Sequence, residues 1–281
     1  MKNKEKNTIW FITGASSGFG KSLAEHAINK GYKVVATARR KEKLEELRSV
    51  APEQVLPIQM DVTKREEVKQ GVVEAIAGWG KIDVLVNNAG YGIVGALEET
   101  PEEELRKQME TNFFGAIAVT QEALPHMRKA EGGAIVNMSS MGGNMSFGGF
   151  SAYSASKFAL EGASEALAQE VAPFGIKTMI VEPGAFRTEF AGNALKHMPK
   201  IKAYDAIVGS TRDFAKEMHN TQEGDPKKAA EAIEKALLSE NTPLRLQLGK
   251  DAVDAVKAHG EQLLADLETW REVAESTTFE S

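Results

Sequence analysis

The sequence predicts a doubly wound α/β fold, in which helices cover both faces of a parallel sheet. From residue 8 to residue 184, short β-branched runs alternate with longer amphipathic stretches, which is the order of strand–helix–strand units. The runs are apolar nearly throughout, as is typical of strands buried on both faces. No linker, low-complexity segment or repeat divides the chain, so we expect one domain over residues 1–281.

The individual elements follow from the spacing of apolar residues. Short apolar runs predict strands at 8–13, 32–38, 55–60, 82–87, 134–139, 176–181 and 244–248. Apolar residues three or four apart predict helices at 17–30, 41–48, 64–77, 101–105, 113–129 and 226–239. A further helix carries Tyr153 and is expected to end near Pro173, because proline cannot continue a helix.

Beyond Gly184 the periodic pattern weakens. After the 8–184 core, which we expect to bind the cofactor and carry the catalytic residues, residues 185–225 show no clean strand and are expected to form a helical substrate loop. Residues 250–276 predict one or two C-terminal helices, with Leu263, Leu267 and Trp270 on one stripe. Such a stripe most often packs on its own domain, which we expect here; a lid or a subunit contact is the alternative.

Composition excludes several classes of function. The net charge of −6 argues against nucleic acid as a partner, because phosphate binding needs a basic surface. The chain has no cysteine, which excludes disulfides, thiolate catalysis and cysteine-ligated zinc. The apolar stretch 9–12 is too short for a signal-peptide core or a membrane span. We expect a soluble cytoplasmic protein that binds no membrane.

Gly14, Gly18 and Gly20 follow the first strand and open the first helix. Glycines at such positions permit a tight turn, a close approach of backbone to a pyrophosphate, and close packing of helix on strand. The helix N-terminus adds N–H donors and partial positive charge. The turn therefore predicts a nucleotide site, with cofactor contacts from Gly14, Ser16, Ser17, Gly18 and Phe19.

The ends of the second and third strands bear on which nucleotide is bound. In NAD-binding sheets the second strand ends in an acidic residue that binds the ribose hydroxyls. Here Arg39 and Arg40 follow Ala38, so we expect NADP(H) to be preferred over NAD(H), whose 2′-hydroxyl carries no charge. The alternative is that both arginines only cap the strand in solvent. Asp61 can accept from an adenine amino group or cap the next helix.

Tyr153 and Lys157 are four residues apart in an expected helix, which places them one turn apart on one face. A lysine cation beside a phenol favours the phenolate, so we expect Tyr153 to exchange a proton near neutral pH. The five histidines show no ligand spacing, and no metal site is predicted.

With these residues in place, the chain is similar to the short-chain dehydrogenase/reductase family from residue 8 to about residue 190. Several independent motifs carry the resemblance: the glycine turn 13–20, Asp61-Val62, Asn87-Asn88-Ala89-Gly90, Asn112, Ser139-Ser140, the Tyr153/Lys157 pair, Pro183-Gly184 and Thr188.

The resemblance implies a seven-stranded Rossmann sheet and a catalytic tetrad of Asn112, Ser140, Tyr153 and Lys157. Tyr153 would be the general acid or base, and Lys157 would lower its pKa and hold the nicotinamide ribose. Ser140, chosen over Ser139 by its distance from the tyrosine, would stabilise charge on the substrate oxygen. Asn112 would hold a water. Further cofactor contacts are implied for Asp61, Val62, Asn88, Ala89, Gly90, Tyr153, Lys157, Pro183, Gly184 and Thr188.

The predicted substrate pocket contains Met141, Phe147 and Phe186 beside Ser140 and Tyr153. These residues are largely apolar, and no arginine cluster marks a phosphate or carboxylate clamp. We expect an apolar ketone, aldehyde or secondary alcohol, as in the branch with steroid and retinoid dehydrogenases and bacterial carbonyl reductases. The alternatives are a 3-oxoacyl-thioester reductase and a non-catalytic NADP(H)-sensing regulatory protein. Many relatives form homodimers or homotetramers, which is expected here too.

Overall fold

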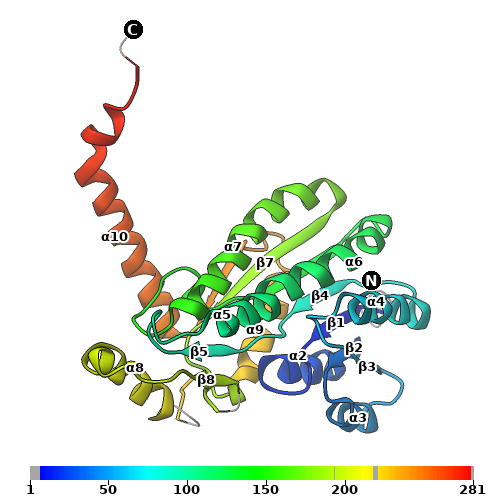
Figure 1. Ribbon diagram of the computed structural model, residues 1–281. Coiled ribbons are helices and arrows are strands. Elements are labelled where there is room, and N and C mark those ends of the chain that lie inside the picture. Colours follow the sequence, from blue (N-terminus) through cyan, green and yellow to red (C-terminus); the bar gives the residue numbers. More distant parts are fainter. Residues whose placement is uncertain (1–6, 193, 218–220, 280–281) are drawn as a thin grey trace.

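The computed structural model describes residues 7–192, 194–217 and 221–279. Its central sheet has seven strands, all pairing in parallel (Figure 1). Across the sheet their order is β3 (Val55–Gln59), β2 (Lys33–Ala38), β1 (Ile9–Thr13), β4 (Val84–Asn87), β6 (Gly133–Met138), β7 (Ile176–Pro183) and β9 (Arg245–Leu248). The chain reverses direction across the sheet between β1 and β4, which makes the doubly wound fold that the sequence predicts.

Helices cover both faces of this sheet, and each face has its own core. In β1, Trp10 and Ile12 belong to one core, whereas Ile9 and Phe11 belong to the other. The first core includes residues of α2 (Gly18–Asn29), α3 (Lys41–Val50) and α9 (Pro226–Leu238); the second includes residues of α4 (Arg65–Trp79), α6 (Gly115–Lys129) and α7 (Ser151–Val171). Burial on both faces explains why the strands read as continuous apolar runs.

The substrate loop predicted for 185–225 is more regular than expected. It contains the strand β8 (Leu195–His197), which pairs in parallel with β5 (Gly92–Val94), and the helix α8 (Asp205–Glu217). Residues 193 and 218–220 of the predicted loop lie outside the described residues. The expectation of no strand was wrong, because a strand of three residues is too short to show an alternating pattern.

The two helices predicted at 101–105 and 113–129 are joined. The helix α5 (Glu102–Met109) continues through a π-helical segment, Glu110–Phe114, into α6. In a π-helical segment each backbone hydrogen bond spans one residue more than in an α-helix. Such segments are often found at functional positions. It contains Asn112, which the sequence assigned to the catalytic tetrad.

The C-terminal stripe does not pack on the domain, so that expectation was wrong. Residues 250–275 form one helix, α10 (Lys250–Glu275), in which Ala252 is the buried residue. Figure 1 shows α10, in orange and red, leaving the body near the sheet and projecting away from it. The preceding strand β9 lies at the sheet edge, so the helix meets the body only through its first turns.

Candidate active site

The glycine turn is packed against the end of β4. A Cβ on Gly14 would lie 2.9 Å from the Asn88 side-chain nitrogen, and one on Gly20 would overlap the Gly14 carbonyl. Gly14 and Gly18 also have φ of 65° and 53°, a region that favours glycine. Asn88 Nδ2 donates to the Thr13 carbonyl at 2.9 Å and so ties the turn to β4. The tight turn and the close packing predicted for these glycines are present, while their approach to a pyrophosphate stays a prediction.

A cleft of about 1980 Å³ lies at the carboxyl ends of the strands. Ligands of doubly wound sheets bind at this edge, beside the reversal of strand order. Every residue predicted to contact cofactor or substrate lines the cleft, from Gly14 and Arg39 to Tyr153 and Thr188. The sequence therefore identified one contiguous site from segments that are up to 174 positions apart, as numbered from Gly14 to Thr188.

The nucleotide end of the cleft carries positive charge. Arg39 and Arg40 are exposed on its wall, and neither guanidinium has an acidic partner within the described parts of the chain. Asp61 Oδ1 accepts from the Thr63 backbone N–H at 3.0 Å and from its hydroxyl at 2.8 Å. Asp61 thus stabilises the turn before α4 and lines the cleft, but it does not cap the helix, whose N-cap position is Lys64.

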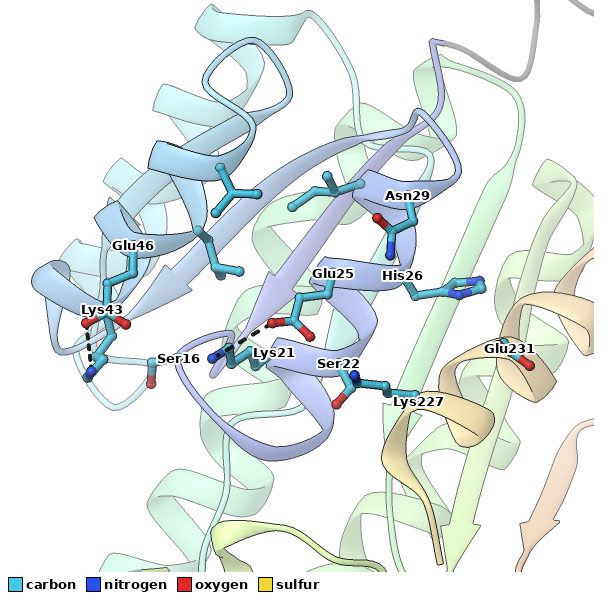
Figure 2. Close-up of a pocket in the computed structure, with 13 residues that line it drawn as sticks. Ser16, Lys21, Ser22, Glu25, His26, Asn29, Lys43, Glu46, Lys227 and Glu231 are labelled. Atoms are coloured by element: carbon cyan, nitrogen blue, oxygen red, sulfur yellow. Dashed lines mark hydrogen bonds and ion pairs between the residues drawn. The ribbon is translucent and has the colours of Figure 1, made fainter.

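A smaller groove of about 570 Å³ lies beside the glycine turn, between α2, α3 and α9 (Figure 2). Its cations are matched by carboxylates: Lys21 lies 3.8 Å from Glu25, and Lys43 lies 2.7 Å from Glu46. His26 points from α2 toward α9, where its ring nitrogen lies 2.8 Å from Glu234. Because these two lysines are paired with carboxylates, the groove attracts a phosphate less than Arg39 and Arg40 of the larger cleft do, which have no acidic partner among the described residues.

Tyr153 and Lys157 are both buried at the inner end of the cleft. The Tyr153 hydroxyl is hydrogen-bonded to Ser140. Lys157 Nζ donates to the Met138 carbonyl at 2.7 Å and lies 5.8 Å from the centre of the Tyr153 ring. The helix therefore presents both side chains to one region, and the end of β6 supplies the serine.

Burial dominates the ionisation of this pair. It raises the pKa of Tyr153 to about 12, although the hydrogen bond to Ser140 acts in the opposite direction. It lowers the pKa of Lys157 to about 8, against the attraction of the Glu161 carboxylate. Loss of hydration thus dominates the pKa of Tyr153 here, and the lowering of that pKa by Lys157 stays a prediction.

Asn112 lies behind the cleft wall rather than on it. Its Nδ2 donates to the Tyr91 carbonyl at 3.0 Å and to Ser156 Oγ at 2.9 Å, and its Oδ1 accepts from the Tyr91 N–H at 3.1 Å. A Cβ on Gly90 would lie 3.1 Å from Asn112 Oδ1 and 3.7 Å from Lys157 Nζ. Two tetrad members, Asn112 and Lys157, thus lie beside Gly90, while the proposed water-holding role of Asn112 stays a prediction.

The two serines after β6 face different ways, as the alternation argument predicts. Ser139 Oγ donates to the buried Glu161 carboxylate at 2.5 Å. Ser140 Oγ accepts from the Gly142 N–H at 3.0 Å and borders the cleft beside Tyr153. Ser139 also lines the cleft, so the choice of Ser140 stays a prediction, which the pairing of Ser139 with Glu161 supports.

The substrate side of the cleft is largely aromatic. The rings of Phe150 and Phe190 lie 6.2 and 5.4 Å from the Tyr153 ring, and Met141 and Phe147 also line this wall. Phe186 also lines the cleft, where its ring packs at 5.1 Å on Phe19 of the glycine turn.

The segment after β7 and the start of α10 also line the cleft. Thr188 Oγ1 accepts from the Phe190 N–H at 3.3 Å, so it caps a short 3-10 turn. Gly184 faces the Asp251 carboxylate, which leaves no room for a Cβ, and Asp251 also accepts from the Ala185 N–H at 2.6 Å. The first turn of α10 therefore supports the Pro183-Gly184 turn, a contact that no local sequence signal shows.

Several cleft residues were missed by the site prediction. Tyr91 directly follows the Asn87–Gly90 motif, which was the one available signal, whereas Lys107 and Glu110 are marked by no pattern. Within the described residues, the structure contains no group of three acidic or histidine side chains that could hold a metal ion. Over the same residues, no helix combines the length and hydrophobicity that crossing a membrane requires.

Comparisons with known proteins agree on one family. The family model described as short chain dehydrogenase matches residues 8–199. An oxidoreductase of Botryotinia fuckeliana is 39% identical over 267 residues, covering 95% of this chain and 97% of its own length. A 3-ketodihydrosphingosine reductase of Bacteroides thetaiotaomicron is 42% identical over 247 residues, covering 86% of this chain and 87% of its own.

Solved structures share the fold and, in some cases, hold a nicotinamide nucleotide. A short-chain dehydrogenase of Streptomyces avermitilis is 49% identical with a TM-score of 0.91, covering 96% of this chain and 100% of its own. An alcohol dehydrogenase of Thermococcus sibiricus, complexed with 5-hydroxy-NADP, is 25% identical with a TM-score of 0.71, covering 86% of this chain and 95% of its own. The chain belongs to the short-chain dehydrogenase family of NAD(P)-dependent oxidoreductases.

Proposed function

We propose that the enzyme uses NADP(H) to interconvert an apolar ketone or aldehyde and its alcohol. The observation that carries this proposal is the hydrogen-bonded Tyr153–Ser140 pair at the inner end of the cleft, flanked by Phe150 and Phe190. Two hydroxyls on one side can bind a carbonyl oxygen, while the phenyl rings supply apolar contact to the rest of a substrate.

The residues of the chain handle the proton and the developing charge. The chemistry that NADPH supplies when bound is a hydride for the carbonyl carbon. In reduction, Ser140 donates a hydrogen bond to the substrate oxygen, and Tyr153 transfers its phenolic proton to that oxygen. Lys157 holds the ribose hydroxyls, and its charge stabilises the phenolate that remains. In oxidation Tyr153 acts as the base.

The preference for NADP(H) rests on the arginine wall. Arg39 and Arg40 follow β2 and line the cleft. In NAD-binding sheets the corresponding strand ends in an acidic residue instead. The Thermococcus sibiricus alcohol dehydrogenase, whose structure contains 5-hydroxy-NADP, supports the same cofactor class. Residues predicted to hold the rest of the nucleotide are those of the glycine turn, Asp61-Val62, Asn88–Gly90 and Thr188.

We expect Arg39→Ala to weaken NADPH binding about tenfold while NADH binding stays the same, because only the former loses a charge-assisted contact. Cofactor fluorescence during titration measures both affinities. Arg48→Ala is the control, since Arg48 lies on the neighbouring helix α3 and does not line the cleft. Equal or tighter binding of NADH by the wild type would contradict the assignment and favour an oxidative, NAD-linked dehydrogenase.

The substrate class is proposed from the aromatic wall and from the relatives. The Bacteroides thetaiotaomicron relative is named for reduction of a ketone, 3-ketodihydrosphingosine. Turnover of apolar ketones with NADPH supports the proposal, and turnover only of phosphorylated substrates would sink it. A 3-oxoacyl-thioester reductase is the second candidate, since a 3-ketoacyl-(acyl-carrier-protein) reductase of Brucella melitensis is 26% identical. Activity restricted to acetoacetyl thioesters would select it.

We expect Tyr153→Phe to lower ketone turnover by at least about a hundredfold and to leave the NADPH affinity nearly unchanged, because it removes the proton donor and keeps the ring. Steady-state kinetics and the same fluorescence titration measure the two effects. Full biological activity in this variant would instead indicate an NADP(H)-sensing regulatory protein without turnover.

A further inference from the structure

Three consecutive residues at the end of β6 bind three residues of α7. The Met138 carbonyl accepts from Lys157 at 2.7 Å, Ser139 donates to Glu161 at 2.5 Å, and Ser140 is hydrogen-bonded to Tyr153. The middle contact involves no member of the tetrad. Along the chain it lies between the contacts of Lys157 and Tyr153.

Glu161 is built into the protein interior. It is 2% exposed, lies one helical turn beyond Lys157, and approaches Arg245 of β9 at 2.9 Å. The next glycine pair leaves space for it, because a Cβ on Gly143 would overlap both Glu161 Oε1 and Ser139 Oγ. Burying this carboxylate costs free energy that its contacts must offset, so packing alone is a weak reason for its presence.

The charges around Glu161 come from three elements. Lys157 and Glu165 lie on α7, Glu182 on β7 is buried and lies 2.9 Å from Arg245, and Arg245 also lies 2.6 Å from Glu165. Burial raises the pKa of Glu161 to about 7, with Ser139 acting against it, Glu182 adding to it and Arg245 lowering it. Burial lowers the pKa of Lys157, and the negative charge of Glu161 partly offsets that lowering.

We propose that Glu161 is a positioning residue for the reaction: through Ser139 it fixes Ser140 against α7, and by its charge it keeps Lys157 cationic. This inference rests on the proposed function, in which Ser140 binds the substrate oxygen and Lys157 must carry a charge. Glu161 itself touches neither substrate nor cofactor, since it does not line the cleft.

Glu161→Gln tests the charge, because glutamine keeps an acceptor for Ser139 and loses the negative charge. We expect the alkaline limb of kcat/KM against pH, and the titration of Lys157, to move down by about one pH unit. The Lys157 titration is followed by NMR of ¹³Cε-labelled lysines in the protein without cofactor, with its signal assigned by Lys157→Arg. The control is Glu165→Gln, which also removes a partner of Arg245 but from an exposed position; its limb should stay at the wild-type pH.

Two further variants separate charge from positioning. Glu161→Asp keeps the charge, so we expect the wild-type alkaline limb with a lower kcat. Ser139→Ala removes a hydrogen bond that lowers the pKa of Glu161, so we expect kcat to fall roughly ten- to a hundredfold while the alkaline limb moves less than in Glu161→Gln. Circular dichroism checks that each variant is folded. An unmoved Lys157 titration in Glu161→Gln, or an equal shift in Glu161→Asp, would overturn the charge role; unchanged kcat in Ser139→Ala would overturn the positioning role.

The two proposals can fail separately. If the wild type reduces no ketone with either cofactor, the proposed function fails, yet the Lys157 titration still reports whether Glu161 controls that lysine. If the wild type reduces ketones but Glu161→Gln behaves as Glu165→Gln does, the proposed function stands and the role of Glu161 is disproved.

Discussion

Lys157 occupies a position that lowers the stability of the folded protein. Its pKa falls from 10.5 to about 8 because burial removes the hydration of the ammonium group. A depressed lysine pKa means that the unfolded chain binds the proton more tightly. The stability cost is therefore full below about pH 8, shrinks as the pH rises, and vanishes above about pH 10.5. Such strain is expected of a residue retained for chemistry rather than packing.

Replacing Lys157 with methionine should therefore stabilise the protein while abolishing turnover. Removing the buried charge gains about 3 kcal/mol at pH 7, and the lost hydrogen bond to Met138 costs about 1 kcal/mol. We expect a net rise of about 2 kcal/mol in the free energy of unfolding, measured by urea denaturation. The gain should disappear when the measurement is repeated at pH 10.5. A variant less stable than wild type at pH 7 would show that Lys157 is not under this burial cost.

At the scale of elements, a buried ion pair holds the substrate loop onto the body. Glu99 accepts from the Ala96 and Ile201 N–H groups, both at 2.7 Å, and from Arg212 of α8 at 2.5 Å. Burial acts against its charge, but these two N–H groups and the guanidinium hold the pKa of Glu99 below its usual range. One carboxylate thus connects the segment after β5 with the segment after β8 and with α8.

We expect Glu99→Gln to loosen this loop, because it leaves the Arg212 cation buried without its partner, a change that costs about 3–5 kcal/mol in proteins. The predicted result is faster proteolysis between residues 195 and 217 and a higher KM for the ketone, with NADPH affinity unchanged. Limited proteolysis with mass spectrometry locates the cuts. Glu98→Gln is the matched control, since Glu98 accepts from Tyr204 at an exposed position. Equal proteolysis of both variants would show that the Glu99–Arg212 ion pair does not hold the loop.

At the scale of the whole molecule, α10 lies apart from both cores. Leu263, Leu264, Leu267, Trp270 and Val273 are each more than half exposed on it, although a helix with such a stripe usually packs on its own domain. Exposed apolar area of this extent marks an interaction site more often than a defect. The homodimer or homotetramer expected from the family resemblance stays a prediction, which light scattering of the purified protein can measure.

Ending the chain after Gly260 should leave the folded domain intact. The removed residues are exposed throughout the described part of α10, whereas Asp251 and Ala252 remain to support the turn at Gly184. We expect the free energy of unfolding to change by less than about 1 kcal/mol, because no buried apolar area is lost. Chemical denaturation at low protein concentration measures this. A loss of several kcal/mol would mean that the distal helix packs against the protein.

The sequence predicted those features that depend on residues close together in the chain. The apolar strands with Trp10 and Phe11 predicted burial on both faces, and the turn at Gly14 predicted the nucleotide end of the cleft. The spacing of Tyr153 and Lys157 placed both on one face of α7. These features depend on backbone geometry over a few residues, so the order of residues is enough to reveal them.

Tertiary structure decided what depends on partners far away in the chain. Burial raised the Tyr153 pKa, and α10, which follows the edge strand β9, projects away from the body. The pairing of β5 with β8, the Glu99–Arg212 pair and the Ser139–Glu161 contact join residues separated by 22 to 113 positions. Desolvation and ion pairing depend on every atom within a few ångströms, and only the folded chain brings those atoms together.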